Sequence, residues 1–173
     1  MKLDVRKIVS IAFYVAAFVI LSIYGTLNFQ GIKITSQNLP IYVAAITLGS
    51  VPGALVGFIG MFISQLITYG FQATTLFWVI PQTALGALCG YIFENKIVTI
   101  EKLNRFSAII ILLQLFVTLL NTIIYAIDGL ILGYFNYIVI FGPLVVRIMS
   151  SIFTGVVYCI LIPVLVKAVK KIH

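Results

Sequence analysis

The stretch YIVIFGPLVVRIMSSIFTGVVYCILIPVLV, residues 137–166, decides the class of fold. It contains one charged residue, Arg147, in a run that is otherwise apolar or weakly polar. A helix needs about 20 such residues to cross the hydrocarbon core of a bilayer, which is roughly 30 Å thick. The stretch is long enough for this, so it predicts a transmembrane helix.

The remainder of the chain has the same character. Its 173 residues are 62% hydrophobic and 9% charged, and the mean hydropathy is +1.22. A soluble domain of this length could not hide so much apolar side chain, because a large share of its surface must face water. The composition therefore indicates an integral membrane protein.

Five more apolar runs precede residues 137–166. Six helices with short loops occupy the whole length, so we expect no separate ATPase or receptor domain. The sequence predicts an all-α membrane protein, a compact bundle of six transmembrane helices in a single domain over residues 1–173. The expected spans are 8–27, 39–50, 53–68, 75–93, 106–127 and 137–166.

The second span is the weakest of the six. It begins at Leu39-Pro40 and ends at the turn formed by residues 49–53, which read GSVPG. Proline is tolerated near a helix start, whereas a cluster of glycine and proline ends a helix. Barely a dozen apolar residues remain between these points, so we expect a helix that is short, tilted or bent at Pro40.

Small residues recur at helical spacing within the spans. Gly49, Gly53 and Gly57 are four residues apart, and Gly86 and Gly90 repeat this spacing in the fourth span. Such pairs let helix backbones approach closely in lipid, where no hydrophobic force draws helices together. We expect the glycines to serve helix packing within the bundle.

The basic residues set the orientation. Lysine and arginine are enriched in the cytoplasmic segments of membrane proteins. An even number of crossings puts both chain ends on one side, so we expect the N- and C-termini in the cytoplasm. The net charge of +7 then serves topology, and no nucleic-acid partner is expected. Nine of the eleven lysines and arginines lie in three clusters beside the apolar runs: Lys2, Arg6 and Lys7; Lys96, Lys102 and Arg105; Lys167, Lys170 and Lys171.

One ionisable residue lies well inside a span. An ionisable group in a bilayer costs several kcal/mol unless it is paired or hydrated, so Arg147 is a functional candidate. Two interpretations are open. Arg147 forms a structural ion pair with Asp128, between spans five and six, or it binds an anionic or carbonyl group of a ligand, for which guanidinium geometry is well suited.

Aromatic and amide side chains gather on the side opposite the basic clusters. Some belong to the aromatic belt of any membrane protein, but Gln82 and Asn121 lie inside apolar runs, where an unpaired amide is costly. A cavity lined by rings and a few polar groups suits a small heterocyclic ligand. The candidate ligand-binding residues are Arg147, Asn121, Trp78, Gln82, Tyr125, Asp128, Gln72, Tyr69, Lys33 and Asn136.

Catalytic chemistry is not indicated. The chain has one histidine, at its C-terminus, and no carboxylate pair, metal-ligand cluster, Ser/His arrangement or phosphate-binding loop. Cys89 and Cys159 lie within apolar runs and are expected to be small packing residues. We therefore expect neither an enzyme nor a metal or cofactor site.

At this point the sequence resembles the substrate-binding S components of energy-coupling factor (ECF) transporters. The resemblance covers the whole chain in size and topology. It is carried by the pair Ala12 and Ala16 in the first span, by residues 39–57, by Leu120-Asn121-Thr122 in the fifth span, and by Arg147 in the sixth.

The resemblance implies a division of labour. An S component of a prokaryotic plasma membrane binds a water-soluble vitamin or precursor in an outward pocket made by spans four to six. A membrane coupling subunit and two cytoplasmic ATPase subunits supply the energy. Ala12 and Ala16 would then be the docking surface for the coupling subunit.

The branch of the family and the alternatives stay open. We find no signature of the riboflavin, thiamin or biotin branches, and residues 60–65, GMFISQ, lack the acidic residue expected of folate-type members. The general vitamin branch, with pantothenate, folate and cobalamin-precursor proteins, is the nearest. A structural scaffold of the MreD cell-shape type is the alternative, and a stand-alone carrier is disfavoured by the lack of repeats.

Overall fold

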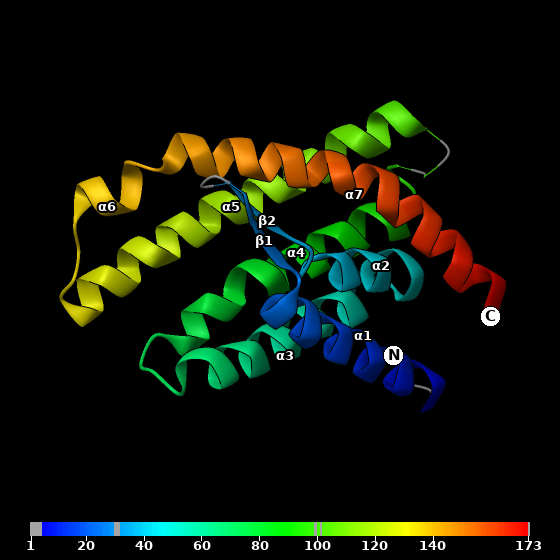
Figure 1. Cartoon of the computed structure of the whole chain (residues 1–173). Helices are drawn as coiled ribbons and strands as arrows, with labels where there is room; N and C mark the ends of the chain where they lie inside the picture. Colours follow the sequence, from blue (N-terminus) through cyan, green and yellow to red (C-terminus); the bar gives the residue numbers. More distant parts are fainter. Residues whose placement is uncertain (1–4, 30–31, 99, 101, 173) are drawn as a thin grey trace.

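The computed structural model describes residues 5–29, 32–98, 100 and 102–172, which form an elongated bundle of helices (Figure 1). Both chain ends lie at one end of the bundle, which we call the terminal end. The opposite, distal end carries α6 and the loops before α4 and α6. The elements in chain order are α1 (Val5–Tyr24), β1 (Thr26–Phe29), β2 (Ile32–Thr35), α2 (Leu39–Leu48), α3 (Ser50–Tyr69), α4 (Thr75–Glu94), α5 (Leu103–Leu132), α6 (Tyr137–Phe141) and α7 (Leu144–Ile172).

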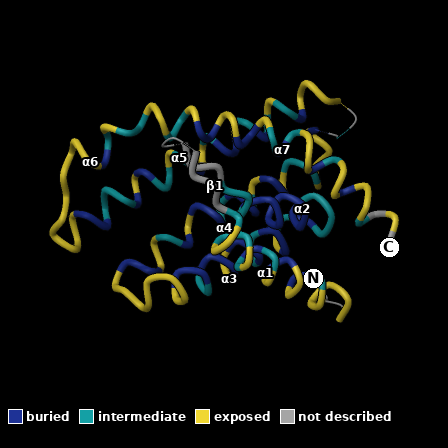
Figure 2. Tube along the Cα trace, in the orientation of Figure 1, coloured by how far each residue is buried: buried dark blue, intermediate teal, exposed yellow. Residues whose placement is uncertain are grey.

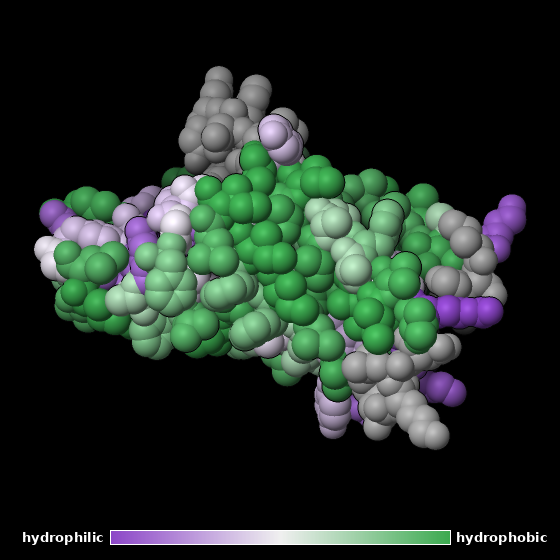
Figure 3. All heavy atoms as spheres, turned by 90° about the horizontal axis from the view of Figure 1, so that it is seen from below, coloured by the Kyte–Doolittle hydropathy of each residue, from purple (hydrophilic) through white to green (hydrophobic). Residues whose placement is uncertain are grey.

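Five helical segments of the described chain are long and apolar enough to cross a membrane: α1, α3, α4, α5 and the run formed by α6 and α7. The face of the bundle seen in Figure 3 is apolar over its middle, and hydrophilic residues gather toward the two ends of the bundle. Exposed positions lie on the periphery, and the buried ones face the interior (Figure 2). The predicted all-α membrane bundle is confirmed.

The helix predicted over residues 39–50 is the exception, because α2 has only 10 residues. At 1.5 Å per residue it is about 15 Å long, half of a hydrocarbon core. It ends at Gly49, whose φ of 109° is a conformation that residues with a Cβ rarely adopt. α3 begins at the next residue, three positions earlier than predicted.

The segment between α1 and α2 carries the chain to the middle of the bundle, so α2 can be shorter than a complete transmembrane helix. β1 and β2 form an antiparallel hairpin, which crosses from the end of α1 toward α5 and α7 (Figure 1). The Tyr158 hydroxyl of α7 donates to the carbonyl oxygen of Thr35 at 2.5 Å. Asn38 then donates to Gln114, about 17 Å along α5. The chain thus enters α2 from the middle of the bundle. No strand was predicted here.

The α3–α4 interface confirms the packing role predicted for the glycines. A Cβ added to Gly57 would overlap the backbone of Gln82, one added to Gly86 would overlap Gly53, and one added to Gly90 would overlap Ser50. The two helix backbones are therefore in direct contact.

The last predicted span is divided in two. Gly142 and Pro143 separate α6 from α7, because proline has no N–H to donate and disfavours a helical residue before it. The break brings the start of α7 alongside the distal half of α5.

Candidate ligand-binding site

A polar stripe runs along one face of α5. Gln114, Thr118, Asn121, Tyr125 and Asp128 follow one another at intervals of four, three, four and three residues. This spacing keeps side chains on one face of a helix. The stripe is about 21 Å long, since 14 residues rise by 1.5 Å each.

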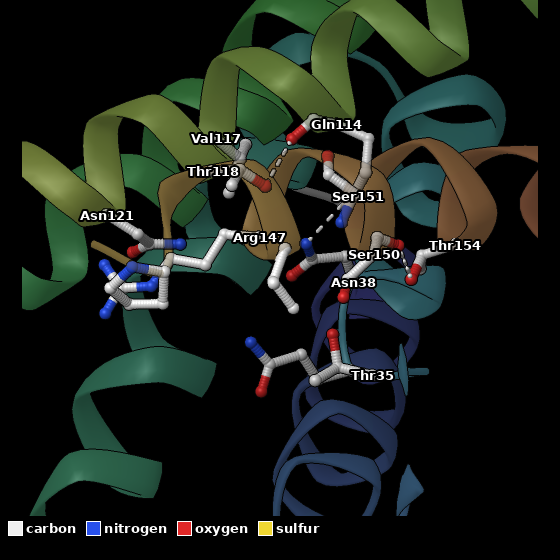
Figure 4. A pocket seen from close by; sticks show the side chains of 13 residues that line it. Thr35, Asn38, Gln114, Val117, Thr118, Asn121, Arg147, Ser150, Ser151 and Thr154 are labelled. Atoms are coloured by element: carbon white, nitrogen blue, oxygen red, sulfur yellow. Dashed lines mark hydrogen bonds between the residues drawn. The ribbon is translucent and has the colours of Figure 1, made fainter. Parts of the chain in front are cut away.

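A second polar stripe lies on α7. Ser150, Ser151 and Thr154 lie three, four and seven residues after Arg147, which keeps all four on one face of α7. They face the stripe of α5 across a cavity of about 420 Å³, the polar cavity (Figure 4). In Figure 4, Arg147 and Asn121 lie at one end of this cavity, and Thr154 lies toward the other. The lining residues are Thr35, Gln37, Asn38, Gln114, Val117, Thr118, Asn121, Pro143, Val146, Arg147, Ser150, Ser151 and Thr154.

Hydrogen bonds from α2 fix one wall of the polar cavity. The Asn38 side chain and the Tyr42 hydroxyl both donate to Gln114 Oε1, at 3.3 and 3.4 Å. Two buried atoms of lining residues, Asn38 Oδ1 and Ser151 Oγ, lack any partner within the described residues, and their side chains are 2% and 4% exposed. Each such group costs about 1–3 kcal/mol when it is buried and unsatisfied. A polar ligand would remove this cost.

Arg147 does not pair with Asp128. Its guanidinium carbon lies 5.3 Å from the centroid of the Tyr125 ring, a cation–π arrangement. Asp128 accepts a hydrogen bond from the Tyr134 hydroxyl instead. Among the described residues no salt bridge joins the two side chains, so the ion-pair interpretation is not supported. The charge of Arg147 is thus free to meet a ligand.

An aromatic cavity of about 310 Å³ opens toward the distal end. The ring centroids of Trp78 and Tyr125 are 6.3 Å apart, and those of Tyr125 and Tyr134 are 6.1 Å apart. Burial and the neighbouring Asp128 carboxylate raise the pKa of the Tyr134 phenol, so it stays protonated and donates. The cavity is lined by Gln65, Tyr69, Gln72, Trp78, Tyr125, Asp128, Leu132 and Tyr134.

A smaller pocket of about 280 Å³, the connecting pocket, has lining residues in common with both cavities. It shares Thr118, Asn121 and Arg147 with the polar cavity, and it shares Trp78 and Tyr125 with the aromatic one. The three spaces follow the stripe of α5 and provide a site for an elongated small molecule.

Most of the predicted ligand-binding residues meet at this site. Two of the ten, Gln82 and Asn136, do not line these cavities, and for a third, Lys33, the side chain is not among the described residues. Gln82 is 1% exposed in α4, and its backbone packs against Gly57. Asn136 caps α6 by accepting from the backbone N–H groups of Ile138 and Val139. The backbone of Lys33 pairs with Asn28, and its side chain lies outside the described residues. The seven that line them are Arg147, Asn121, Trp78, Tyr125, Asp128, Gln72 and Tyr69.

Sequence reasoning missed part of the lining. Gln114 and Thr118 extend the polar spacing of Asn121 and Tyr125, and Ser151 lies four residues after Arg147, so the periodicity would have identified them. Asn38 has no comparable signal. It reaches Gln114, 76 positions away, only because the hairpin carries the chain into the bundle.

The residues predicted to dock the coupling subunit lie on α1, away from the three cavities along α5. Ala12 and Ala16 are exposed on α1 and line an apolar groove of about 540 Å³ between α1 and α3, toward the terminal end. Nearer the distal end α1 is held against α3, where Phe18 packs on Gly60 and the Ser22 and Ser64 hydroxyls are 2.7 Å apart.

Comparison with known proteins places the chain in a family. No curated protein sequence is significantly similar to it. Residues 2–171 match the family described as ECF-type riboflavin transporter, S component. The resemblance to S components is confirmed, and the MreD-type scaffold is not supported. The family description names riboflavin, although the sequence carries no short signature of the riboflavin branch.

The family fixes the general role. Its members are multi-pass proteins of the prokaryotic plasma membrane and bind a vitamin substrate for an ECF module; they are not enzymes. Five long apolar helices agree with this localisation. The chain therefore belongs to the ECF-type riboflavin transporter S component family and is the substrate-binding subunit of an ECF transporter.

Proposed function

We propose that the polar cavity, with its connecting pocket, is the substrate site and captures a water-soluble vitamin or precursor from outside the cell. One observation carries the proposal. Arg147, Asn38 and Ser151 line one cavity between α5 and α7, and two buried atoms of these residues, Asn38 Oδ1 and Ser151 Oγ, have no hydrogen-bond partner among the described residues. Buried polar groups without a partner are uncommon, because each one lowers stability.

Arg147 has the main role in this proposal. Its fork of N–H donors matches a carboxylate, phosphate or carbonyl group. The Tyr125 ring holds the guanidinium at the junction of the two cavities without neutralising it. A hydrogen bond to a charged group is worth about 1.5–3 kcal/mol, so losing it should weaken binding by roughly 10- to 100-fold.

The substrate is the finer part of the proposal. The family description names riboflavin, which makes riboflavin the first compound to test. The amides and hydroxyls of the polar cavity suit a chain of hydroxyl or carbonyl groups, and the rings around Trp78 suit a flat heterocycle. Pantothenate, folate and a cobalamin precursor complete the panel.

Delivery would use the groove on α1. We infer that a membrane coupling subunit, energised by two cytoplasmic ATPase subunits, docks a helix against Ala12 and Ala16. Small side chains there permit close helix approach. The terminal end would then face the cytoplasm, in agreement with the basic residues near Lys7, Arg105 and Lys167.

The reporter for binding is already in the chain. Trp78 is the one tryptophan and lines both the aromatic cavity and the connecting pocket. Titrating the panel against its fluorescence, on full-length protein in lipid nanodiscs, should identify a ligand that binds saturably. Arg147→Gln should then weaken that ligand at least 10-fold without lowering the unfolding temperature.

The matched control is Arg105→Gln, which removes an exposed arginine near the start of α5. It should leave affinity unchanged. The assignment of Arg147 would be wrong if Arg147→Gln kept full affinity but unfolded at a lower temperature. Failure of every panel compound to bind would count against the polar cavity as a vitamin site.

A further inference from the structure

The aromatic cavity contains a carboxylate that the proposed function does not use. Asp128 is 6% exposed, and its Oδ2 accepts the hydrogen bond from Tyr134. Its Oδ1 has no partner among the described residues, although it belongs to a residue that lines the cavity. A buried carboxylate without a counter-charge is costly, and one phenol does not neutralise it.

The walls around this carboxylate are aromatic. Trp78, Tyr125 and Tyr134 form a series in which each ring is tilted against the next, by 50° and 43°. The π face of an aromatic ring carries negative electrostatic potential and attracts cations. Rings with a carboxylate beside them are the combination that recognises ammonium groups.

Two kinds of ligand group could satisfy Asp128. A neutral N–H donor would form a hydrogen bond and leave the negative charge in a medium of low polarity. A positively charged nitrogen would form the same contact, neutralise the charge and interact with the rings. The positively charged nitrogen is therefore favoured over the neutral donor, both by its attraction to the carboxylate and by its interaction with the rings. Arg147 lies over one of the three rings, Tyr125, but among the described residues it forms no salt bridge with Asp128, so it does not neutralise this carboxylate by direct contact.

We propose that the aromatic cavity is a subsite for a positively charged nitrogen, either quaternary or protonated, carried by a small organic substrate. The inference rests on the proposed function, since it extends the same site toward the distal end. The substrate would place an anionic or carbonyl group at Arg147 and its cationic nitrogen at Asp128. Riboflavin carries no such nitrogen, so the subsite favours a cationic vitamin or precursor over the compound in the family description.

The test uses choline and its neutral isostere 3,3-dimethylbutan-1-ol as probes, on full-length protein in nanodiscs. The two have nearly the same shape and differ in charge. Choline should change Trp78 fluorescence saturably and bind at least 10-fold more tightly than the alcohol. Equal affinities, or no saturable effect of choline, would overturn the subsite. This comparison needs no variant, so it does not depend on any substitution being tolerated.

A pair of variants then locates the charge. Asp128→Asn keeps the shape of the side chain and should lower choline affinity at least 10-fold. Glu94→Gln removes a carboxylate from an exposed residue at the end of α4 and should have no effect. Unchanged choline binding in Asp128→Asn would contradict the proposal.

The two proposals fail separately. If a panel vitamin binds through Arg147 while choline and the alcohol are equivalent, only the cation subsite is wrong. If choline binds through Asp128 but no panel vitamin binds, the cation subsite stands and the panel compounds are excluded as substrates of the polar cavity.

Discussion

The α3–α4 pair and the α5–α7 pair solve helix packing in opposite ways. α3 and α4 meet backbone to backbone through Gly57, Gly86 and Gly90, which leaves no room between them. α5 and α7 approach closely at Gly155 and Ile111, and elsewhere they enclose the polar cavity. In lipid the first pair gains from van der Waals contact, whereas the second gives up such contact where its polar groups line the cavity.

This difference in packing predicts that the α3–α4 pair mainly determines stability and that the α5–α7 pair mainly determines ligand binding. A close glycine interface is sensitive to any added atom, because neither backbone can move aside. The cavity lining can lose polar groups without collapse, because those groups already lack some of their partners. We therefore expect substitutions in α3–α4 to affect folding, and substitutions in the lining of α5–α7 to affect ligand affinity.

The largest effect is expected at the glycine interface. Gly57→Val would force a branched side chain into the backbone of Gln82. Overpacking costs about 1–3 kcal/mol, occasionally more, and we expect a loss above that range here because the obstacle is backbone. Thermal unfolding in detergent should show a large drop, with little folded protein recovered.

Gly133→Ala is the control for that substitution. No atom lies within 4 Å of the added Cβ, and the only cost is the φ of 79°. A left-handed residue costs roughly 1–2 kcal/mol, so the loss should be much smaller. Equal destabilisation by the two changes would remove the distinction between a close interface and an open position.

The next largest effect is expected for a substitution that reduces transport without changing ligand affinity. Ala16→Phe would fill the groove between α1 and α3, far from both cavities. We expect ligand affinity to stay within twofold of the original and uptake in cells with the full transporter to fall at least 10-fold. Retained uptake would show that a partner does not dock at this groove.

A moderate effect is expected at an unpartnered hydroxyl. Ser151→Ala removes a buried group that has no hydrogen bond in the described structure. Affinity should fall by about 5- to 10-fold, the value of one hydrogen bond. Stability should stay level or rise by up to about 1 kcal/mol, because an unsatisfied group is gone. A stability loss without an affinity loss would make Ser151 a structural residue.

The smallest effect is expected where a hydroxyl already has its partner. Ser22→Ala removes the contact with Ser64 between α1 and α3. Hydrogen bonds between membrane helices average about 0.6 kcal/mol, so we expect a small fall in unfolding temperature. Affinity should not change, in contrast to Ser151→Ala, since Ser22 lines neither cavity.

Part of the fold and of the candidate site could be predicted from the sequence. Apolar runs and basic clusters predicted the bundle, because the thickness of a bilayer fixes helix length. The costs of buried charge and buried amide pointed to Arg147 and Asn121, and Asp128 was named as a possible partner of Arg147. A short second helix was expected, but the hairpin and the position of Asn38 were not predictable, because they depend on contacts between distant segments. Gln82 met the same criteria as Asn121 but faces the packed α3–α4 side.

A structure of the protein with its identified vitamin bound would test the proposed substrate site directly. We expect ligand density between α5 and α7, within hydrogen-bond distance of Arg147 and of at least one of Asn38 and Ser151. Density in the groove between α1 and α3, or a bound ligand that leaves Arg147 uncontacted, would contradict the proposal.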